Sequence, residues 1–152
     1  MLTRTTQHAL RAMVAIAQQE GERFVAANSI SEMLDLPPSF LAKVLQRLTA
    51  AGLLVSLRGP KGGVRLAKSA QGISLRDVIE AIEGATPFDE CLFGWPGCTN
   101  SEPCPIHREW GPALQSVSDL VDATSLADIT RAASSTKGQD AALIADKRLV
   151  NP

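Results

Sequence analysis

Three cysteines and one histidine stand close together in the sequence, at Cys91, Cys98, Cys104 and His107. The chain has 3 cysteines in all. An odd number in so short a segment is unlike the paired disulfide framework of a small secreted protein. Thiolate and imidazole groups are ligands for zinc and for iron-sulfur clusters. We therefore expect metal or redox chemistry from this segment.

The spacing Cys91-x6-Cys98-x5-Cys104-x2-His107 lies in a stretch rich in proline and glycine, which suits a loop that wraps a cluster. Cys104 precedes a proline, which predicts a helix N-terminus whose partial positive charge favours a thiolate. His107 would follow one turn later on the same face. The ligand set favours iron-sulfur. Zinc on three cysteines and one histidine is a second interpretation, and metal-free thiols are a third.

The segments before the cysteines predict three helices. Apolar residues at helical spacing indicate a first helix over about 6–19. A short second helix is predicted over 27–34. A third runs from about Pro38, which suits a first helical turn, to Ala51 and stops at Gly52. Two short apolar segments, 53–57 and 64–66, flank a glycine-rich turn at 58–63 and predict a hairpin. This order predicts a winged helix-turn-helix, a mainly α fold with a small β-hairpin.

Polar and cationic side chains occupy the exposed face of the third helix and surround the hairpin tip. A helix in the major groove and a cationic wing would contact DNA bases and phosphates. The charge distribution agrees, because residues 1–70 carry nine Lys/Arg against four Asp/Glu and residues 71–152 carry six against twelve. The expected DNA-binding residues are Ser39, Lys43, Gln46, Arg47, Arg58, Lys61 and Arg65.

A fourth helix is expected from a capping sequence at Ser74 to about Gly84. A long helix follows the cysteines, and Pro112 should kink or restart it. Its apolar stripe of Trp110, Leu114, Val117 and Val121 is expected to pair with a second copy of the chain, so that a two-fold dimer meets a palindromic site. We thus expect a DNA-binding domain over 1–83, a cysteine loop over 84–104, a dimerisation helix and a final short helix over 105–133, and a polar, disordered tail over 134–152.

Residues 1 to about 133 resemble the IscR/NsrR-type (Rrf-type) family of bacterial winged-helix regulators. The resemblance rests on the N-terminal segment 2–10, on 52–56 leading into 58–63, and on the cysteines followed by His107 and Trp110. It implies a dimeric regulator whose third helix enters the major groove. It also implies that Arg58 enters the minor groove and that the cysteine loop lies near the dimerisation helix.

The resemblance also bears on the cofactor. IscR-like members hold a [2Fe-2S] cluster with three cysteines and a histidine matching His107, although their first cysteine gap is one residue shorter. NsrR-like members hold [4Fe-4S] with an aspartate that falls at Gln7, a poor ligand. A [2Fe-2S] cluster is therefore favoured over [4Fe-4S]. Ala42 stands where IscR has a glutamate involved in operator choice, so the operator sequence does not carry over.

Other classes of protein fit the sequence less well. A small thiol- or metal-dependent redox enzyme would need a substrate pocket and an acid-base partner, and neither a nucleotide-binding glycine loop nor a triad is recognisable. A cluster-free regulator sensing through thiols and a winged helix that binds protein are two further hypotheses. No segment approaches the roughly 18 apolar residues of a membrane span, and Arg4 and Arg11 interrupt any signal peptide. We expect a cytoplasmic protein with no membrane partner.

Overall fold

The N-terminal half of the chain folds into three helices followed by a two-stranded antiparallel hairpin. The structure is a computed structural model that describes residues 2–19, 23–85, 88 and 90–135. The elements in order are α1 (Arg4–Ala17), α2 (Ala27–Leu34), α3 (Pro38–Ala50), β1 (Leu54–Leu57), β2 (Gly63–Leu66), a 3₁₀ turn (Ala70–Gly72), α4 (Leu75–Glu83), α5 (His107–Ala123) and α6 (Leu126–Ser135).

Local signals in the sequence explain where these helices begin and end. The Thr3 side chain accepts a hydrogen bond from the backbone of Thr6 and caps α1, which begins two residues earlier than the apolar pattern predicts. Asp35 ends α2 in the left-handed conformation, and Pro38 opens α3. Ser74 and Asp77 form a reciprocal capping box at the start of α4, as predicted. The predicted bounds of α2 are those observed.

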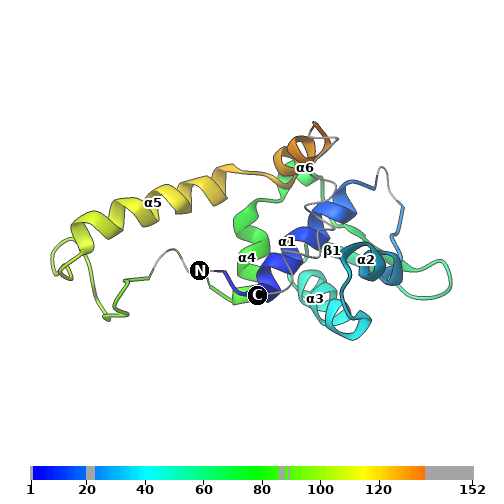
Figure 1. Ribbon diagram of the computed structural model, residues 1–152, viewed down its shortest axis with the longest axis horizontal. Helices are drawn as coiled ribbons and strands as arrows, with labels where there is room; N and C mark the ends of the chain where they lie inside the picture. The colour runs from blue at the N-terminus through cyan, green and yellow to red at the C-terminus, as the bar shows by residue number, and fades with distance from the viewer. Residues whose placement is uncertain (1, 20–22, 86–87, 89, 136–152) are drawn as a thin grey trace.

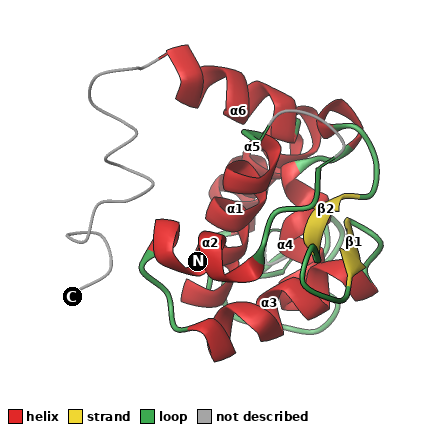
Figure 2. Cartoon of the chain, turned by 90° about the vertical axis from the view of Figure 1, so that its right-hand side faces the viewer, coloured by secondary structure: helices red, strands yellow, loops and turns green. Residues whose placement is uncertain are grey.

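The hairpin packs against the segment before α2 (Figure 2). Its register pairs Leu54 with Leu66 and Leu57 with Gly63. Val25 forms an isolated antiparallel bridge to Val64, with both backbone hydrogen bonds at 2.8 and 2.9 Å. A Cβ on Gly63 would lie only 2.1 Å from the carbonyl oxygen of Val25, so this close approach requires glycine.

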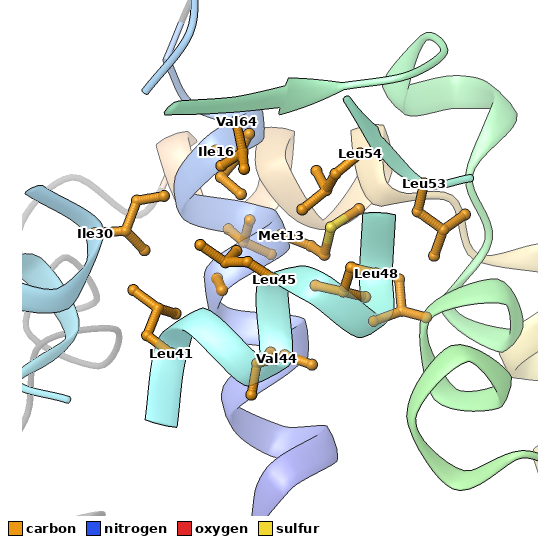
Figure 3. Close-up of a cluster of buried hydrophobic side chains, with 14 of the residues drawn as sticks. Met13, Ile16, Ile30, Leu41, Val44, Leu45, Leu48, Leu53, Leu54 and Val64 are labelled. Atoms are coloured by element: carbon orange, nitrogen blue, oxygen red, sulfur yellow. The ribbon is translucent and has the colours of Figure 1, made fainter. Parts of the chain in front are cut away.

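The core lies between α1, α2, α3 and the hairpin (Figure 3). Met13 of α1 is fully buried among leucines and valines from α3 and the hairpin. The buried stripe predicted for α3 is confirmed, since its four members are each at most 5% exposed: Leu41, Val44, Leu45 and Leu48. The expected winged-helix head, mainly α with a small β-hairpin, is thus observed.

The final helix, α6, packs against this head. Leu126 is 0% exposed and is part of the same core cluster as α1. The starts of α4 and α6 are joined by a bridge between Ser74 and Ser125 and by a hydrogen bond of 2.8 Å from Leu126 N to Ile73 O. The apolar face of this short helix is therefore buried against α1.

Helix α5 projects from the head and carries the cysteine loop at its far end (Figure 1). It is one helix with Pro112 inside it, so the proline does not restart the helix. Pro112 lies in the second turn, and its missing N–H leaves only the carbonyl of Arg108, four residues earlier, without its helical donor. Of the tail expected over 134–152, residues 134 and 135 belong to α6, and the rest lies outside the described residues.

Candidate metal centre and DNA-binding surface

The three thiols converge at the outer end of α5. The sulfur atoms of Cys91, Cys98 and Cys104 all lie within 4.8 Å of one another. Cys104 is buried, Cys91 and Cys98 are partly buried, and none forms a disulfide. The backbone N–H of Cys104 donates to Cys98 Sγ at 3.4 Å. The loop therefore brings together the three soft donors that the sequence indicates.

His107, at the start of α5, contacts one member of this group. Its Nδ1 lies 3.3 Å from Cys98 Sγ. Its Nε2 lies 2.9 Å from Oδ1 of Asn100, a residue that the sequence pattern does not point to. The only sequence signal for Asn100 is a polar amide two positions after a cysteine. The helix begins at His107 and not at the proline after Cys104, so Cys104 lies just outside α5.

The loop shifts the pKa values of Cys91 and Cys98 in opposite directions. Hydrogen bonds from the backbone of Trp95 and Phe93, aided by the other two thiols, lower the pKa of Cys91 to about 7. The backbone of Cys104 lowers the pKa of Cys98, but partial burial and the hydrogen bonds with the two neighbouring thiols outweigh this and raise it. Cys91 is thus the group most ready to bind a metal as thiolate near neutral pH.

Space for a bound group adjoins the thiols on two sides. One pocket of about 250 Å³ is lined by Cys91, Cys98, His107 and Trp110, together with other residues of the loop and α5. A second of about 370 Å³ borders Cys91 and Cys98 beside Trp95. The indole Nε1 of Trp110 is buried and has no hydrogen-bond partner among the described residues. The site combines soft donors with room for more than one atom.

The expected DNA-binding residues divide into two groups. Six are exposed on α3 and on the hairpin turn, whereas Arg65 is partly buried; the six are Ser39, Lys43, Gln46, Arg47, Arg58 and Lys61. A groove of about 540 Å³ between α3 and β1 is lined by Gln46, Arg58 and small residues such as Ala42. A helix and a cationic wing therefore border one groove, as in a winged helix that contacts DNA.

Arg47 and Arg65 also make contacts within the protein. The Arg47 guanidinium donates to the carbonyl of Ile82 and so caps the last turn of α4. The Arg65 guanidinium lies 5.1 Å from the centre of the Phe24 ring. The sequence could not reveal either contact, because both partners, Ile82 and Phe24, come from segments that are distant along the chain.

The predicted dimerisation stripe is only partly accessible. Val117 is 38% exposed, and Trp110 and Leu114 are partly buried. Val121 is 7% exposed and thus buried within the single chain, next to the part of α5 that contacts α4. Leu120, which is 62% exposed, is the most accessible apolar residue of this helix. Any partner of α5 would therefore meet Val117 and Leu120 rather than Val121.

The fold and the groove define a winged-helix regulator of transcription. The sequence model of the Rrf2 family, described as iron-dependent transcriptional regulator, matches residues 2–132. The chain belongs to the Rrf2 family. It is 31% identical over 150 residues to the HTH-type transcriptional regulator IscR of Erwinia tasmaniensis, covering 99% of this chain and 87% of that protein. It is 30% identical over 147 residues to IscR of Serratia proteamaculans, covering 97% and 85%.

Solved structures show the same fold. CymR, the global cysteine regulator of B. subtilis, has a TM-score of 0.72 and 26% identity, covering 86% of this chain and 96% of that chain. IscR of T. potens has a TM-score of 0.69 and 27% identity, covering 91% and 93%. These relatives are named as regulators, which agrees with the prediction that the chain is no enzyme. No helix among the described residues is long and apolar enough to cross a membrane.

Proposed function

We propose that this protein is a DNA-binding regulator whose operator affinity responds to an iron-sulfur cluster held by Cys91, Cys98, Cys104 and His107. The observation that carries the proposal is the convergence of three sulfur atoms within 4.8 Å of one another beside an imidazole nitrogen. The same chain presents the α3 and wing groove. The relatives named IscR, and the iron-dependent description of the family, support the choice of iron.

The four proposed ligands are of the types that hold an iron-sulfur cluster. Three thiols and one imidazole are the soft ligands that iron-sulfur centres use, and adjoining pockets of about 250 and 370 Å³ leave room beside the thiols. The lowered pKa of Cys91 favours its thiolate. The resemblance to IscR-like members, rather than the donor set itself, favours [2Fe-2S] over [4Fe-4S]. When bound, such a cluster supplies a redox-active centre that is sensitive to oxidants and to iron supply.

A single metal ion is the second candidate. Zinc with Zn–S bonds of about 2.3 Å holds its sulfurs ~3.8 Å apart in a tetrahedron. The sulfur separations of at most 4.8 Å lie within reach of that arrangement. Anaerobic purification with iron, sulfide and zinc analysis separates the two. Iron and sulfide in equal amounts support the cluster, whereas colourless protein with one zinc per chain overturns the cofactor assignment and leaves the DNA-binding function in place.

Replacing each ligand tests the site more finely. Cys91→Ala, Cys98→Ala or Cys104→Ala should abolish or strongly reduce the visible chromophore, because the chain has no fourth cysteine to substitute. His107→Ala should alter the cluster without preventing its assembly. The exposed Ser101→Ala in the same loop serves as the matched control. Operator affinity that is equal for the loaded protein and the three cysteine variants would refute the sensing role.

The DNA contacts are proposed for the exposed residues of α3 and the wing. Lys43→Ala and Arg58→Ala should weaken operator binding and reduce the slope of log K against log salt by about 0.9 for each phosphate that the variant no longer neutralises. Arg131→Ala on α6 removes a cation that is 73% exposed and away from α3, and should change neither. Unchanged affinity for both test variants on an operator bound by the wild type would remove this surface from the interface.

A two-fold dimer that associates through α5 is proposed. Its partner would be a palindromic operator, and its location the cytoplasm, where bacterial DNA lies. Val117 is exposed and Leu114 partly so on this projecting helix. Leu114→Glu and Val117→Glu should each place a charge in an apolar interface and yield monomers that bind the operator weakly. Gln115→Glu adds the same charge to an exposed position on the face of α5 opposite Val117 and should remain dimeric. Dimers of unchanged stability in both test variants would show that a different surface associates.

A further inference from the structure

The two ring nitrogens of His107 have different partners. Nδ1 lies 3.3 Å from the sulfur of Cys98, and Nε2 lies 2.9 Å from Oδ1 of Asn100. An amide oxygen only accepts hydrogen bonds, so Nε2 must be the nitrogen that carries the proton. In a neutral imidazole Nδ1 then keeps its lone pair, and that lone pair faces the thiol group. This is the arrangement that a histidine needs in order to bind a metal through Nδ1.

We propose that Asn100 is a positioning residue for His107, which fixes the Nε2–H tautomer and aims Nδ1 at the sulfur of Cys98, the member of the thiol group that it contacts. Metal-bound histidines commonly donate their second ring N–H to an oxygen, and the partner sets both the tautomer and the ring orientation. The inference rests on the proposed metal site, to which it adds a residue outside the ligand set.

The loop holds Asn100 in place by its own hydrogen bonds. Asn100 lies in a tight turn, in which the backbone N–H of Thr99 donates to Glu102 O at 3.3 Å. The N–H of Glu102 donates back to the Thr99 hydroxyl at 3.2 Å, and that hydroxyl is 2.8 Å from the hydroxyl of Ser101. The turn lies between the second and third cysteines, so the backbone that carries the thiols also carries the acceptor for His107.

Helix α5 leaves room for the ring on its other side. Gly111 lies one turn after His107, and a Cβ there would be 3.7 Å from His107 Nε2, an ordinary contact distance. The helix therefore neither clamps nor displaces the ring in this region. Among the described residues, the polar partners of the imidazole are Cys98 and Asn100. Removing the asparagine should accordingly free the ring to rotate.

The tautomer is measured directly in the metal-free, reduced full-length chain. Long-range ¹H–¹⁵N correlation at mildly alkaline pH distinguishes Nε2–H from Nδ1–H, and the only other histidine, His8, is assigned with His8→Gln. We expect His107 to be the Nε2–H tautomer in the wild type and in Asn100→Asp, whose carboxylate also only accepts. Asn100→Ala should give a mixture. A predominant Nδ1–H tautomer in the wild type would overturn the inference.

Metal affinity supplies the second measurement, with Co²⁺ alone as the probe under anaerobic conditions. Loss of such a histidine partner typically costs about 10- to 100-fold in metal affinity. We expect that loss for Asn100→Ala, near wild-type affinity for Asn100→Asp, and no change for Glu102→Gln, which alters an exposed side chain of the same turn and keeps its backbone hydrogen bonds. Asn100→Ala that binds Co²⁺ as tightly as the wild type refutes the positioning role. A wild type that binds neither Co²⁺ nor a cluster refutes the proposed metal site instead, and the tautomer still decides the role of Asn100.

Discussion

Glu83 joins the end of α4 to the beginning of α1, and its removal should destabilise the head. Its carboxylate accepts hydrogen bonds from the backbone N–H of Thr3 at 3.1 Å, from the Thr3 hydroxyl at 2.7 Å and from the Thr6 hydroxyl. Thr3 is also the N-cap of α1, and Thr6 is 0% exposed. One carboxylate therefore fixes the first turn of a helix that supplies much of the core.

The magnitude follows from these three bonds. A hydrogen bond to a charged group contributes about 1.5–3 kcal/mol at a buried position, but partly exposed bonds contribute less, so we expect Glu83→Ala to cost about 2 kcal/mol. Glu83→Gln keeps an acceptor oxygen and loses only the charge, which should cost about 1 kcal/mol. For a chain of this size each kcal/mol lowers Tm by roughly 2–4 °C.

The effect should depend on pH with a defined sign. Hydrogen bonds from Thr6 and then from Thr3 lower the pKa of Glu83 below its ordinary value. A carboxylate whose pKa is lowered by folding stabilises the protein above its unfolded pKa of about 4.3, and this stabilisation is lost as pH falls through the folded pKa. The difference between wild type and Glu83→Gln should thus be full at neutral pH and shrink under acid conditions.

Thermal and urea unfolding at fixed protein concentration, followed by circular dichroism from neutral to acid pH, measures these differences. Glu32→Gln and Glu32→Ala change an exposed carboxylate on α2 and serve as matched controls. A Glu83→Ala protein no less stable than Glu32→Ala would refute the reasoning. So would a gap between wild type and Glu83→Gln that widens as the pH falls.

Three further predictions concern the packing of the head. Gly63→Ala should cost more than about 2 kcal/mol, judged by urea unfolding, because the new Cβ would be 2.1 Å from Val25 O; a near-neutral result would show that the hairpin can move away. Leu126→Ala should lower the free energy of unfolding by about 2–5 kcal/mol in the same assay, since this residue is fully buried. Almost no loss of stability would show that α6 does not pack on the head. Arg76→Ala removes hydrogen bonds from α4 to Asp122 and should speed amide exchange in the last turns of α5; unchanged exchange would contradict that anchoring role.

Those parts of the fold that depend on neighbouring residues could be predicted from the sequence. The capping box at Ser74, the two prolines at the start of α3 and the glycine after its end act within a few positions. The helix bounds predicted from them are therefore close to those observed. The glycines of the turn between β1 and β2 likewise predicted the hairpin. The same holds for the thiols, because their residue type and their clustering in the sequence predicted a common site.

Contacts between distant segments could not be predicted in this way. An amphipathic α6 has the same pattern whether Leu126 faces a partner chain or the core of its own head. Val121 fits an apolar stripe equally well in both situations. Arg47 looks like a DNA contact on a helical wheel, and only the position of α4 shows that its guanidinium caps the carbonyl of Ile82. Periodicity indicates which face is apolar or polar, but not what covers it.

The two ends of α5 are held in different ways, and this difference gives the proposed sensing a physical route. Near its C-terminal end, Ser118 and Asp122 accept hydrogen bonds from Arg76 of α4. At its first turn, His107 faces the thiols of the cysteine loop. In the proposed mechanism, a group bound by the thiols would therefore act on a helix whose opposite end is fixed to the winged-helix head. A dimer formed along α5 would then convert a change at His107 into a change in the spacing of two α3 helices, which is the quantity that a palindromic operator reads.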